Sequence, residues 1–153
     1  MKILVTGCSG QLGKAIISQT PKDFELLLPK RNELDLSDQI NCRNYIEKFH
    51  PEFIINCGAF TNVDLAEKES DLCFEINTKA PITFANVLKE YGGNFLQIST
   101  DYVFDGCKNS PYEVKDKRNP ISKYGFSKAI CEENLEEILN PNNQLIILRT
   151  SWL

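Results

Sequence analysis

The sequence is poor in histidine, and it has neither a basic cluster nor a long apolar run. His50 is its only histidine, which disfavours a histidine-built metal site and a Ser-His-Asp triad, so we expect no metal centre. A net charge of −4 argues against a nucleic-acid surface. No apolar stretch approaches the roughly 20 residues that cross a bilayer, and the first residues lack a signal-peptide pattern. We therefore expect a cytoplasmic protein with no membrane or nucleic-acid partner.

Closely spaced cysteine pairs are missing as well. The cysteines are scattered along the chain and none of them forms a C-x-x-C pair. Several lie in apolar contexts, which is typical of buried, reduced thiols in a cytosolic protein. The six are Cys8, Cys42, Cys57, Cys73, Cys107 and Cys131.

The length and composition fit one soluble domain. The chain has 153 residues, of which 42% are hydrophobic and 25% are charged. This composition is ordinary for a globular protein, and the length allows a substantial core. We predict a single domain over residues 1–153.

The most informative stretch is the beginning of the chain, MKILVTGCSGQLG. Residues 2–6 form a short apolar run that predicts a strand buried on both faces of a parallel sheet. Gly7, Gly10 and Gly13 follow, and helical character continues from Lys14. A strand that turns through glycines into a helix exposes the N–H groups of the first helical turn, which suit a pyrophosphate. The spacing G-x-x-G-x-x-G differs from the G-x-G-x-x-G dinucleotide motif, and tight packing alone could also require these glycines.

The rest of the chain alternates between strand and helix patterns. Strands are predicted over residues 24–28, 53–57, 94–98 and 144–148, and helices over 39–49, 70–91 and 122–139. Ser37 or Asp38 is expected to cap the first of these helices, and Pro120 to lie in the first turn of the last. Asn77 and Pro81 predict that the middle helix consists of two pieces that meet near Asn77. The alternation predicts an α/β fold with a doubly wound, Rossmann-like parallel sheet.

The loop after the second strand bears on cofactor choice. In dinucleotide folds an acidic residue at this place binds the ribose 2′-OH, whereas a basic residue accommodates a 2′-phosphate. This chain has Lys30 and Arg31 there, which favours NADPH, with NADH possible; a solvated basic loop is the alternative. Asp35 is near enough to contact an adenine amino group, although a turn aspartate before a helix cap explains it nearly as well.

The carboxyl ends of the third and fourth strands carry small and polar residues. Gly58 and Ala59 follow the third strand, where small residues let a flat ligand lie across the sheet edge. Thr100 and Asp101 follow the fourth. Tyr124 and Lys128 are four residues apart and therefore share a helix face. An ammonium near a phenol lowers its pKa from about 10 towards neutrality, and Thr100 could hydrogen-bond the same substrate oxygen.

Taken together, these motifs resemble the extended short-chain dehydrogenase/reductase family, and within it the dTDP-4-dehydrorhamnose reductases. The resemblance spans the chain, and its segments are VTGCSGQLG at 5–13, LDLSD at 34–38, INCGAFTNVDLAE at 55–67, STDYVFDG at 99–106, YGFSK at 124–128 and RTSWL at 149–153.

The resemblance implies an NAD(P)-binding domain that reduces dTDP-4-dehydro-L-rhamnose to dTDP-L-rhamnose. It implies that Tyr124 is the general acid, that Lys128 holds the nicotinamide ribose and lowers the pKa of Tyr124, and that Thr100 polarises the ketone. The implied cofactor-binding residues are Gly7, Gly10, Gln11, Leu12, Gly13, Lys30, Arg31, Asp35, Leu36, Cys57, Gly58, Ala59, Asn77, Tyr124 and Lys128. The implied substrate-binding residues are Thr100, Asp101 and Trp152.

Members of this family continue after the RTSW segment with a substrate-binding half. We therefore expect a chain truncated before its substrate domain, completed by a homodimer or by a complementing C-terminal chain. Three alternatives remain: another sugar-nucleotide reductase or epimerase of the superfamily, a non-catalytic NADP-binding regulatory subunit, and a folded but inactive remnant.

Overall fold

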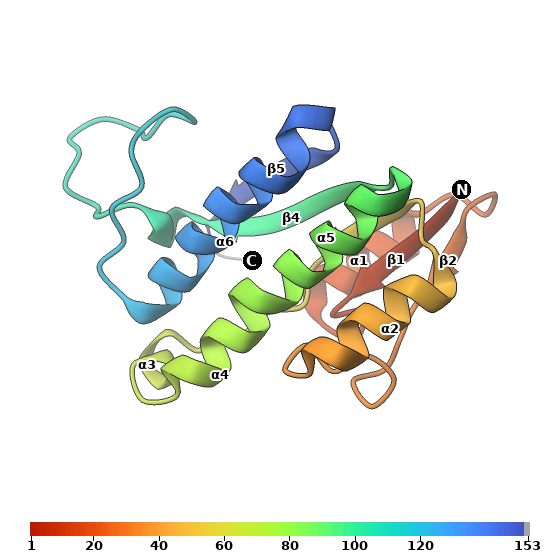
Figure 1. The fold of residues 1–153 in the computed structure, drawn as a ribbon. Coiled ribbons are helices and arrows are strands. Elements are labelled where there is room, and N and C mark those ends of the chain that lie inside the picture. The colour runs from red at the N-terminus through yellow and green to blue at the C-terminus, as the bar shows by residue number, and fades with distance from the viewer. Residues whose placement is uncertain (152–153) are drawn as a thin grey trace.

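A five-stranded parallel sheet forms the centre of the molecule, in the order β2-β1-β3-β4-β5 (Figure 1). The computed structural model describes residues 1–151. The strands are β1 (Lys2–Thr6), β2 (Glu25–Leu27), β3 (Phe53–Asn56), β4 (Asn94–Thr100) and β5 (Leu145–Thr150). All four neighbouring pairs are parallel, which confirms the predicted sheet.

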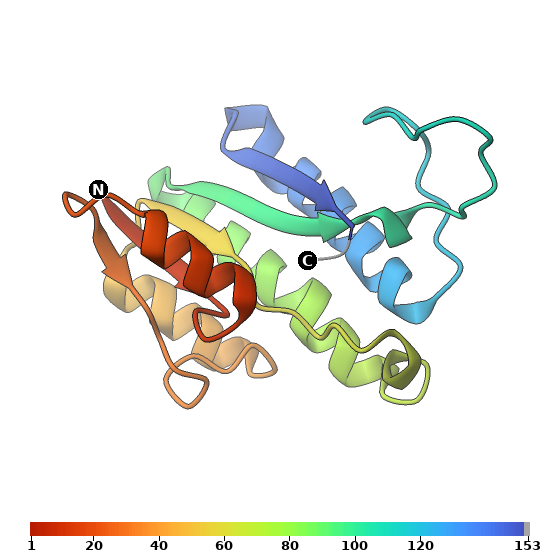
Figure 2. The same ribbon diagram turned by 180° about the vertical axis from the view of Figure 1, so that it is seen from behind.

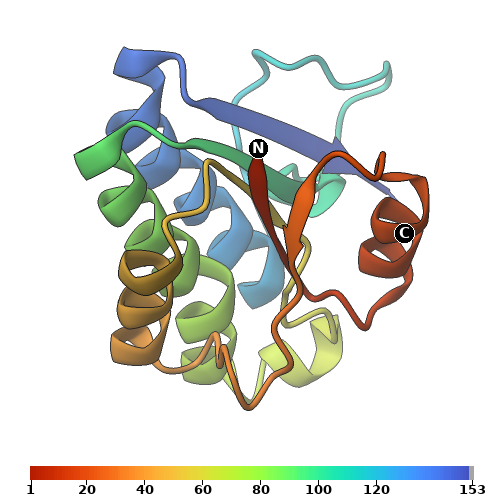
Figure 3. The ribbon, with the colours of Figure 1, turned by 90° about the vertical axis from the view of Figure 1, so that its right-hand side faces the viewer.

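Helices lie on both faces of this sheet. The helix α1 (Gln11–Gln19) covers one face, while α2 (Gln39–Phe49), α5 (Ala80–Tyr91) and α6 (Lys123–Leu139) pack on the other (Figure 3). The chain leaves β1 on one side to reach β2, and returns to β3 on the opposite side. The strand order therefore reverses between β1 and β3, which is where doubly wound sheets bind ligands.

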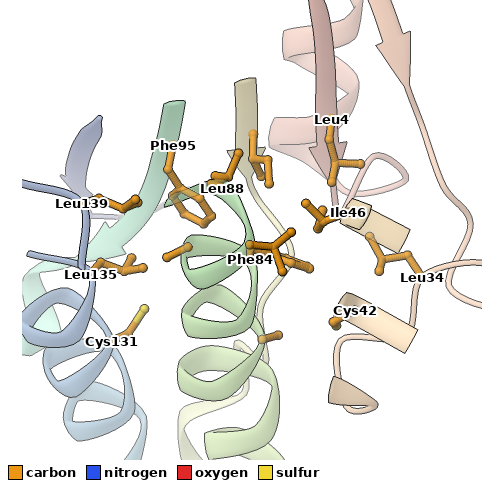
Figure 4. Packing of buried hydrophobic residues seen from close by; sticks show 14 residues of the cluster. Leu4, Leu34, Cys42, Ile46, Phe84, Leu88, Phe95, Cys131, Leu135 and Leu139 are labelled. Carbon is orange, nitrogen blue, oxygen red and sulfur yellow. The ribbon is translucent and has the colours of Figure 1, made fainter. Parts of the chain in front are cut away.

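The main core lies between the sheet and the three helices α2, α5 and α6. Leu4 and Phe95 supply it from β1 and β4, and Phe84 and Leu135 from the helices (Figure 4). Ile54 of β3 belongs to the same cluster. The side chains of this cluster are buried. Those from the strands share one face of the sheet, because successive strand residues alternate between its two faces. This packing holds the carboxyl ends of β1, β3 and β4 side by side.

Most element bounds match the sequence pattern, with local differences. α1 begins at Gln11, so the last of the three glycines lies inside it, and β4 and β5 extend to Thr100 and Thr150. Asp38 caps α2 by accepting hydrogen bonds from the amides of Ile40 and Asn41. Ser122 caps α6, so Pro120 lies in the preceding loop and not in the helix as predicted.

The predicted irregularity near Asn77 is a π-helical segment. The short helices α3 (Val63–Ala66) and α4 (Ser70–Phe74) lead into η1 (Glu75–Lys79), which continues directly into α5. Pro81 has no N–H to offer the preceding turn, and the helix widens just before it, where the Ala80 amide bonds the Glu75 carbonyl. The helix therefore continues through Asn77 with a wider turn, a form that often occurs at functional sites. Two 3₁₀ turns, η2 (Asp101–Val103) and η3 (Asn140–Asn142), complete the elements.

On the face that carries α1, the described part of the chain leaves β5 uncovered by any helix (Figure 2). Ile146 and Leu148 point to this side and are 53% and 49% exposed. Leu145, on the opposite side of the same strand, packs against the core. Among residues 1–151, no helix is long and apolar enough to span a membrane.

Candidate functional site

A cavity of about 760 Å³ opens at the carboxyl ends of β1, β3 and β4. Its size falls within the usual range for small-molecule sites, about 300–1,000 Å³. It brings together most of the predicted site residues. Those on its wall are Gly7, Gly10, Gln11, Leu12, Gly13, Arg31, Asp35, Leu36, Cys57, Gly58, Ala59, Thr100, Asp101, Tyr124 and Lys128.

The glycines of the loop after β1 are required by close backbone packing. Gly7 has a φ of +61°, and a Cβ there would lie 2.7 Å from the amide nitrogen of Gly58. A Cβ on Gly13 would collide with the carbonyl oxygen of Gly7. The amide of Gly10 donates to that same carbonyl at 2.9 Å. The packing explanation therefore holds for Gly7 and Gly13, and it brings β1, α1 and Gly58 into contact.

The first turn of α1 faces the cavity without a side-chain cap. Its N-cap is Gly10, and no side chain accepts from the first-turn amides. Gln11, Leu12 and Gly13 stand at the positions whose N–H groups have no partner within a helix. All three residues line the cavity. Free donors and the positive end of the helix dipole make this part of the wall suited to an anionic phosphate.

Two basic residues were expected at the end of β2, and the structure separates them. Arg31 lines the cavity, whereas Lys30 lies outside its wall. The Lys30 amide donates to the Glu33 carboxylate at 2.7 Å, which fixes the turn. Asp35 reaches the cavity and also accepts from the amide and the hydroxyl of Ser37, which lower its pKa.

Thr100 and Asp101 lie where β4 ends. The Thr100 hydroxyl accepts from the amide of Tyr102 at 3.2 Å and lies 3.1 Å from a carboxylate oxygen of Asp101, to which it donates. This arrangement fixes the hydroxyl at the cavity wall. The ring of Tyr102 meets that of Tyr124 edge-on, with centroids 5.8 Å apart.

Tyr124 and Lys128 both reach the cavity from α6, but their electrostatics differ from the expectation. Burial raises the pKa of Tyr124, and the Thr100 hydroxyl only partly opposes this. Burial lowers the pKa of Lys128, while the charge of Glu132 works in the other direction. The expected lowering of the Tyr124 pKa by Lys128 is not found among the effects on this phenol, and the Lys128 ammonium bonds the Ile98 carbonyl at 2.6 Å.

Asn77 lies behind the cavity and not on its wall. Its amide oxygen accepts from the Phe60 amide at 2.8 Å, and its amide nitrogen donates to the Phe60 carbonyl at 3.0 Å. The same nitrogen is 3.1 Å from the hydroxyl of Ser127 on α6. Asn77 thus joins the loop after β3 to α6, and its predicted contact with a cofactor stays a prediction.

Glu132 lies one turn beyond Lys128 on α6 and is fully buried. It pairs with Arg118 at 2.5 Å and with Arg149 at 2.6 Å. Arg118 comes from the long loop after β4 and Arg149 from β5. Burial pushes the pKa of Glu132 up, but the hydrogen bonds from both arginines outweigh it, so the pKa is lowered.

Sequence reasoning missed three buried polar residues at the base of the cavity, Thr6, Asn56 and Gln97, of which Thr6 and Asn56 are part of its wall. They are in register across β1, β3 and β4, and each hydrogen-bonds the next. The available signal was a polar residue near the end of each of three apolar strand patterns. The predicted substrate residue Trp152 lies outside the described residues.

Comparisons with known proteins place this geometry in a family. The family model described as "RmlD substrate binding domain" matches residues 1–153. The chain belongs to this family. A dTDP-4-dehydrorhamnose reductase from Aggregatibacter actinomycetemcomitans is 36% identical over 153 residues, which cover 99% of this chain and 51% of that protein.

Solved structures agree with this family. A dTDP-4-dehydrorhamnose reductase from Clostridium acetobutylicum has a TM-score of 0.92 and 37% identity, over 99% of this chain and 54% of that one. The enzyme from Bacillus anthracis, solved in complex with NADP, has a TM-score of 0.90 and 34% identity, over 99% and 53%. The chain spans about half the length of the curated relatives it matches. The family membership and the Rossmann-like fold confirm the resemblance seen in the sequence.

Proposed function

We propose that the cavity binds NADPH and that its residues catalyse the reduction of dTDP-4-dehydro-L-rhamnose to dTDP-L-rhamnose. One observation carries this proposal: Thr100, Tyr124 and Lys128 lie on the wall of the same cavity as the open end of α1. The relatives with dTDP-4-dehydrorhamnose reductase activity in their names support the choice of substrate. The NADP complex of the Bacillus anthracis relative supports the choice of cofactor.

The residues present fit a dinucleotide. The uncapped first turn of α1 would hold the pyrophosphate, since Gln11 and Leu12 can offer backbone N–H donors there. Gly10 keeps this approach free of a side chain. Asp35 and Leu36 would lie at the adenine, and Arg31 is the basic residue on the wall that can pair with a 2′-phosphate. Lys128 would donate to the nicotinamide ribose, because its ammonium bonds only one protein acceptor that the structure shows.

Bound NADPH would supply a hydride to the C4 ketone. The chain's own residues provide the proton and the polarisation. Burial keeps Tyr124 protonated at neutral pH, so its phenol can give a proton to the ketone oxygen as a general acid. The Thr100 hydroxyl, which donates to Asp101 in the structure, would turn to donate to that oxygen and stabilise the negative charge that develops on it.

The proposal is tested by fluorescence titration of the chain with NADPH and with NADH, followed by turnover measurements on the dTDP-sugar. We expect saturable binding that is tighter for NADPH. Removal of the Arg31 guanidinium in Arg31→Ala should weaken NADPH binding by about ten-fold, since a charge-assisted contact contributes about 1.5 kcal/mol, and should leave NADH binding unchanged.

Lys22→Ala is the matched control, because it removes one positive charge from the turn before β2, at the end of that strand remote from the cavity. It should leave the ratio of the NADPH and NADH affinities as it is. Absence of saturable binding for both nucleotides would overturn the proposal, and equal weakening of both by Arg31→Ala would refute the role of Arg31.

A further inference from the structure

The hydrogen-bond ladder between β3 and β4 ends one step before the cavity. Asn94 donates to the Glu52 carbonyl at the start of this ladder, and such bonds recur at every second residue of a parallel pair. Continued regularly, the ladder would join the amide of Gly58 to the carbonyl of Ile98. The observed register stops at Asn56 and Gln97, so this last bond is absent.

The Gly58 amide bonds a side chain instead. It donates to the Thr6 hydroxyl at 3.0 Å, across towards β1. That hydroxyl in turn donates to the Asn56 amide oxygen at 2.5 Å. The change of partner satisfies the Gly58 amide and leaves the Ile98 carbonyl, on the other side of the gap, without its ladder donor.

Two side chains donate hydrogen bonds to the Ile98 carbonyl in place of the missing ladder amide. The Gln97 amide nitrogen donates to it at 2.6 Å, and the Lys128 ammonium donates to it at 2.6 Å. A carbonyl oxygen has two lone pairs, so these donors fill it. The other end of the Gln97 amide accepts from Asn56 at 2.8 Å, which closes the connection from Gly58 to Lys128.

The three connecting residues are buried polar side chains, and packing alone does not explain them. Thr6, Asn56 and Gln97 are 2%, 1% and 1% exposed; they follow the buried row of Leu4, Ile54 and Phe95 on the core side of the sheet, and Thr6 and Asn56 also reach the cavity wall. Burying a hydroxyl and two primary amides there is unfavourable unless their groups are paired. Apolar side chains at the same positions would pack at lower cost, but they would offer nothing to the Gly58 amide or the Ile98 carbonyl.

We infer that Thr6, Asn56 and Gln97, the polar row, are positioning residues. They keep the Ile98 carbonyl out of the β-ladder, so that it accepts a hydrogen bond from the Lys128 ammonium. This inference rests on the proposed function for the role of Lys128 in cofactor binding, but the hydrogen bond between Lys128 and Ile98 is a property of the chain without cofactor. Gln97 is not on the cavity wall and acts on the cavity through Lys128.

The first test observes the Lys128 ammonium directly in the free chain. Lysine labelled with ¹⁵N at Nζ gives a resonance for a buried, hydrogen-bonded ammonium, and Lys128→Met identifies it by its loss. Gln97→Met should shift or broaden this resonance, because the carbonyl loses its second donor. Gln144→Met is the matched control: Gln144 is a buried glutamine whose amide donates to the Gly93 carbonyl at 2.6 Å, at the far end of the sheet.

Thr6→Val keeps the shape of the side chain and releases the Gly58 amide to rejoin Ile98. It should change the Lys128 resonance in the same sense, and it decides the question if Gln97→Met does not fold. An unchanged resonance in both variants, or an equal change in Gln144→Met, would overturn the inference.

The second test is a double-mutant cycle on NADPH binding. Gln97→Met should weaken binding by about five-fold, the size of one net hydrogen bond, and should have no further effect in a Lys128→Met background. The full effect persisting in that background would show a merely structural role and overturn the inference. A wild-type chain that binds no NADPH would refute the proposed function, while the resonance of Lys128 would still decide this inference.

Discussion

Tyr124 occupies an environment that favours the neutral phenol. Its ring is half-buried against Tyr102, and burial raises its pKa. A phenol that stays protonated suits the reductive direction, in which the ketone oxygen gains a proton. Because the acid form is the active one, reduction should slow as the pH rises through the pKa of Tyr124.

Replacement of Tyr124 by Phe tests this role. The variant keeps the ring and its packing and removes only the acidic proton. We expect turnover on dTDP-4-dehydro-L-rhamnose to fall by at least about a hundred-fold, the usual contribution of a general acid, with NADPH affinity nearly unchanged. Steady-state kinetics and a fluorescence titration measure the two quantities.

Tyr91→Phe is the control for loss of a phenol hydroxyl. Tyr91 donates to the Pro51 carbonyl at the end of α5 that is remote from the cavity, so its loss should leave turnover intact. Equal turnover in Tyr124→Phe and the wild type would refute the role of Tyr124.

At this scale the sequence predicts which residues meet but not how they bond. Spacing alone places Tyr124 and Lys128 on one helix face, and the end of a strand places Thr100 near them. The partner of Lys128 is a backbone carbonyl, which no side-chain pattern identifies. The separation of Lys30 from Arg31 likewise depends on the turn that Glu33 fixes.

At the scale of elements, Glu132 joins α6 to β5 and to the long loop after β4. Its carboxylate is fully buried, while its partners Arg118 and Arg149 are 16% and 18% exposed. The negative charge of Glu132 compensates the positive charges of two guanidinium groups that are largely shielded from water. The cluster therefore fixes the loop against the helix that carries Tyr124 and Lys128.

Glu132→Gln should destabilise the chain by about 3 kcal/mol, because breaking a buried ion pair leaves its partner charges uncompensated. Urea unfolding at neutral pH measures the change. Glu136→Gln is the control, since Glu136 pairs with Arg118 but is 37% exposed; it should cost less than about 1 kcal/mol.

The stability difference between the wild type and Glu132→Gln should also depend on pH. The native pKa of Glu132 lies below its ordinary value, so its stabilisation is complete above the unfolded-state pKa. It is lost as the pH falls through the native pKa. The difference in free energy of unfolding between the wild type and Glu132→Gln should therefore shrink in acid, and a difference that stays constant from neutral to acidic pH would contradict this assignment.

Element types were readable from the sequence, whereas their ends depended on tertiary contacts. β4 continues to Thr100 because β5 pairs with it along nearly its whole length, from Phe95 to Thr100. The wide turn at Asn77 also depends on distant partners, since its amide bridges Phe60 and Ser127. Neither contact has a local signal.

At the scale of the whole molecule, the sheet is covered unequally. One face packs against three helices, while Ile146 and Leu148 on the other face of β5 remain half-exposed. Exposed apolar surface next to a sheet edge favours association. We expect the 153-residue chain to associate as its concentration rises.

Replacing Ile146 and Leu148 together by Thr should reduce this association and change the free energy of unfolding by less than about 1 kcal/mol, as for other exposed sites. Analytical ultracentrifugation and urea unfolding measure the two effects. Leu145→Thr, on the core side of the same strand, should cost more stability and leave association as it is. Unchanged association in the double variant would show that another surface is responsible.

Apolar side chains on strands that are buried on both faces specify the register between neighbouring strands only weakly. A slip of β3 by two residues keeps Ile54 and its neighbours on the core side, so hydrophobic burial hardly opposes it. The same slip sets Thr6 opposite Ile54 and leaves the amides of Asn56 and Gln97 unpaired, at about 1–3 kcal/mol for each group. The polar row therefore selects a single alignment of β1, β3 and β4 during folding. A substitution in this row that suits the chemistry of the cavity must also preserve that alignment, so these positions have less freedom to vary than burial alone would allow.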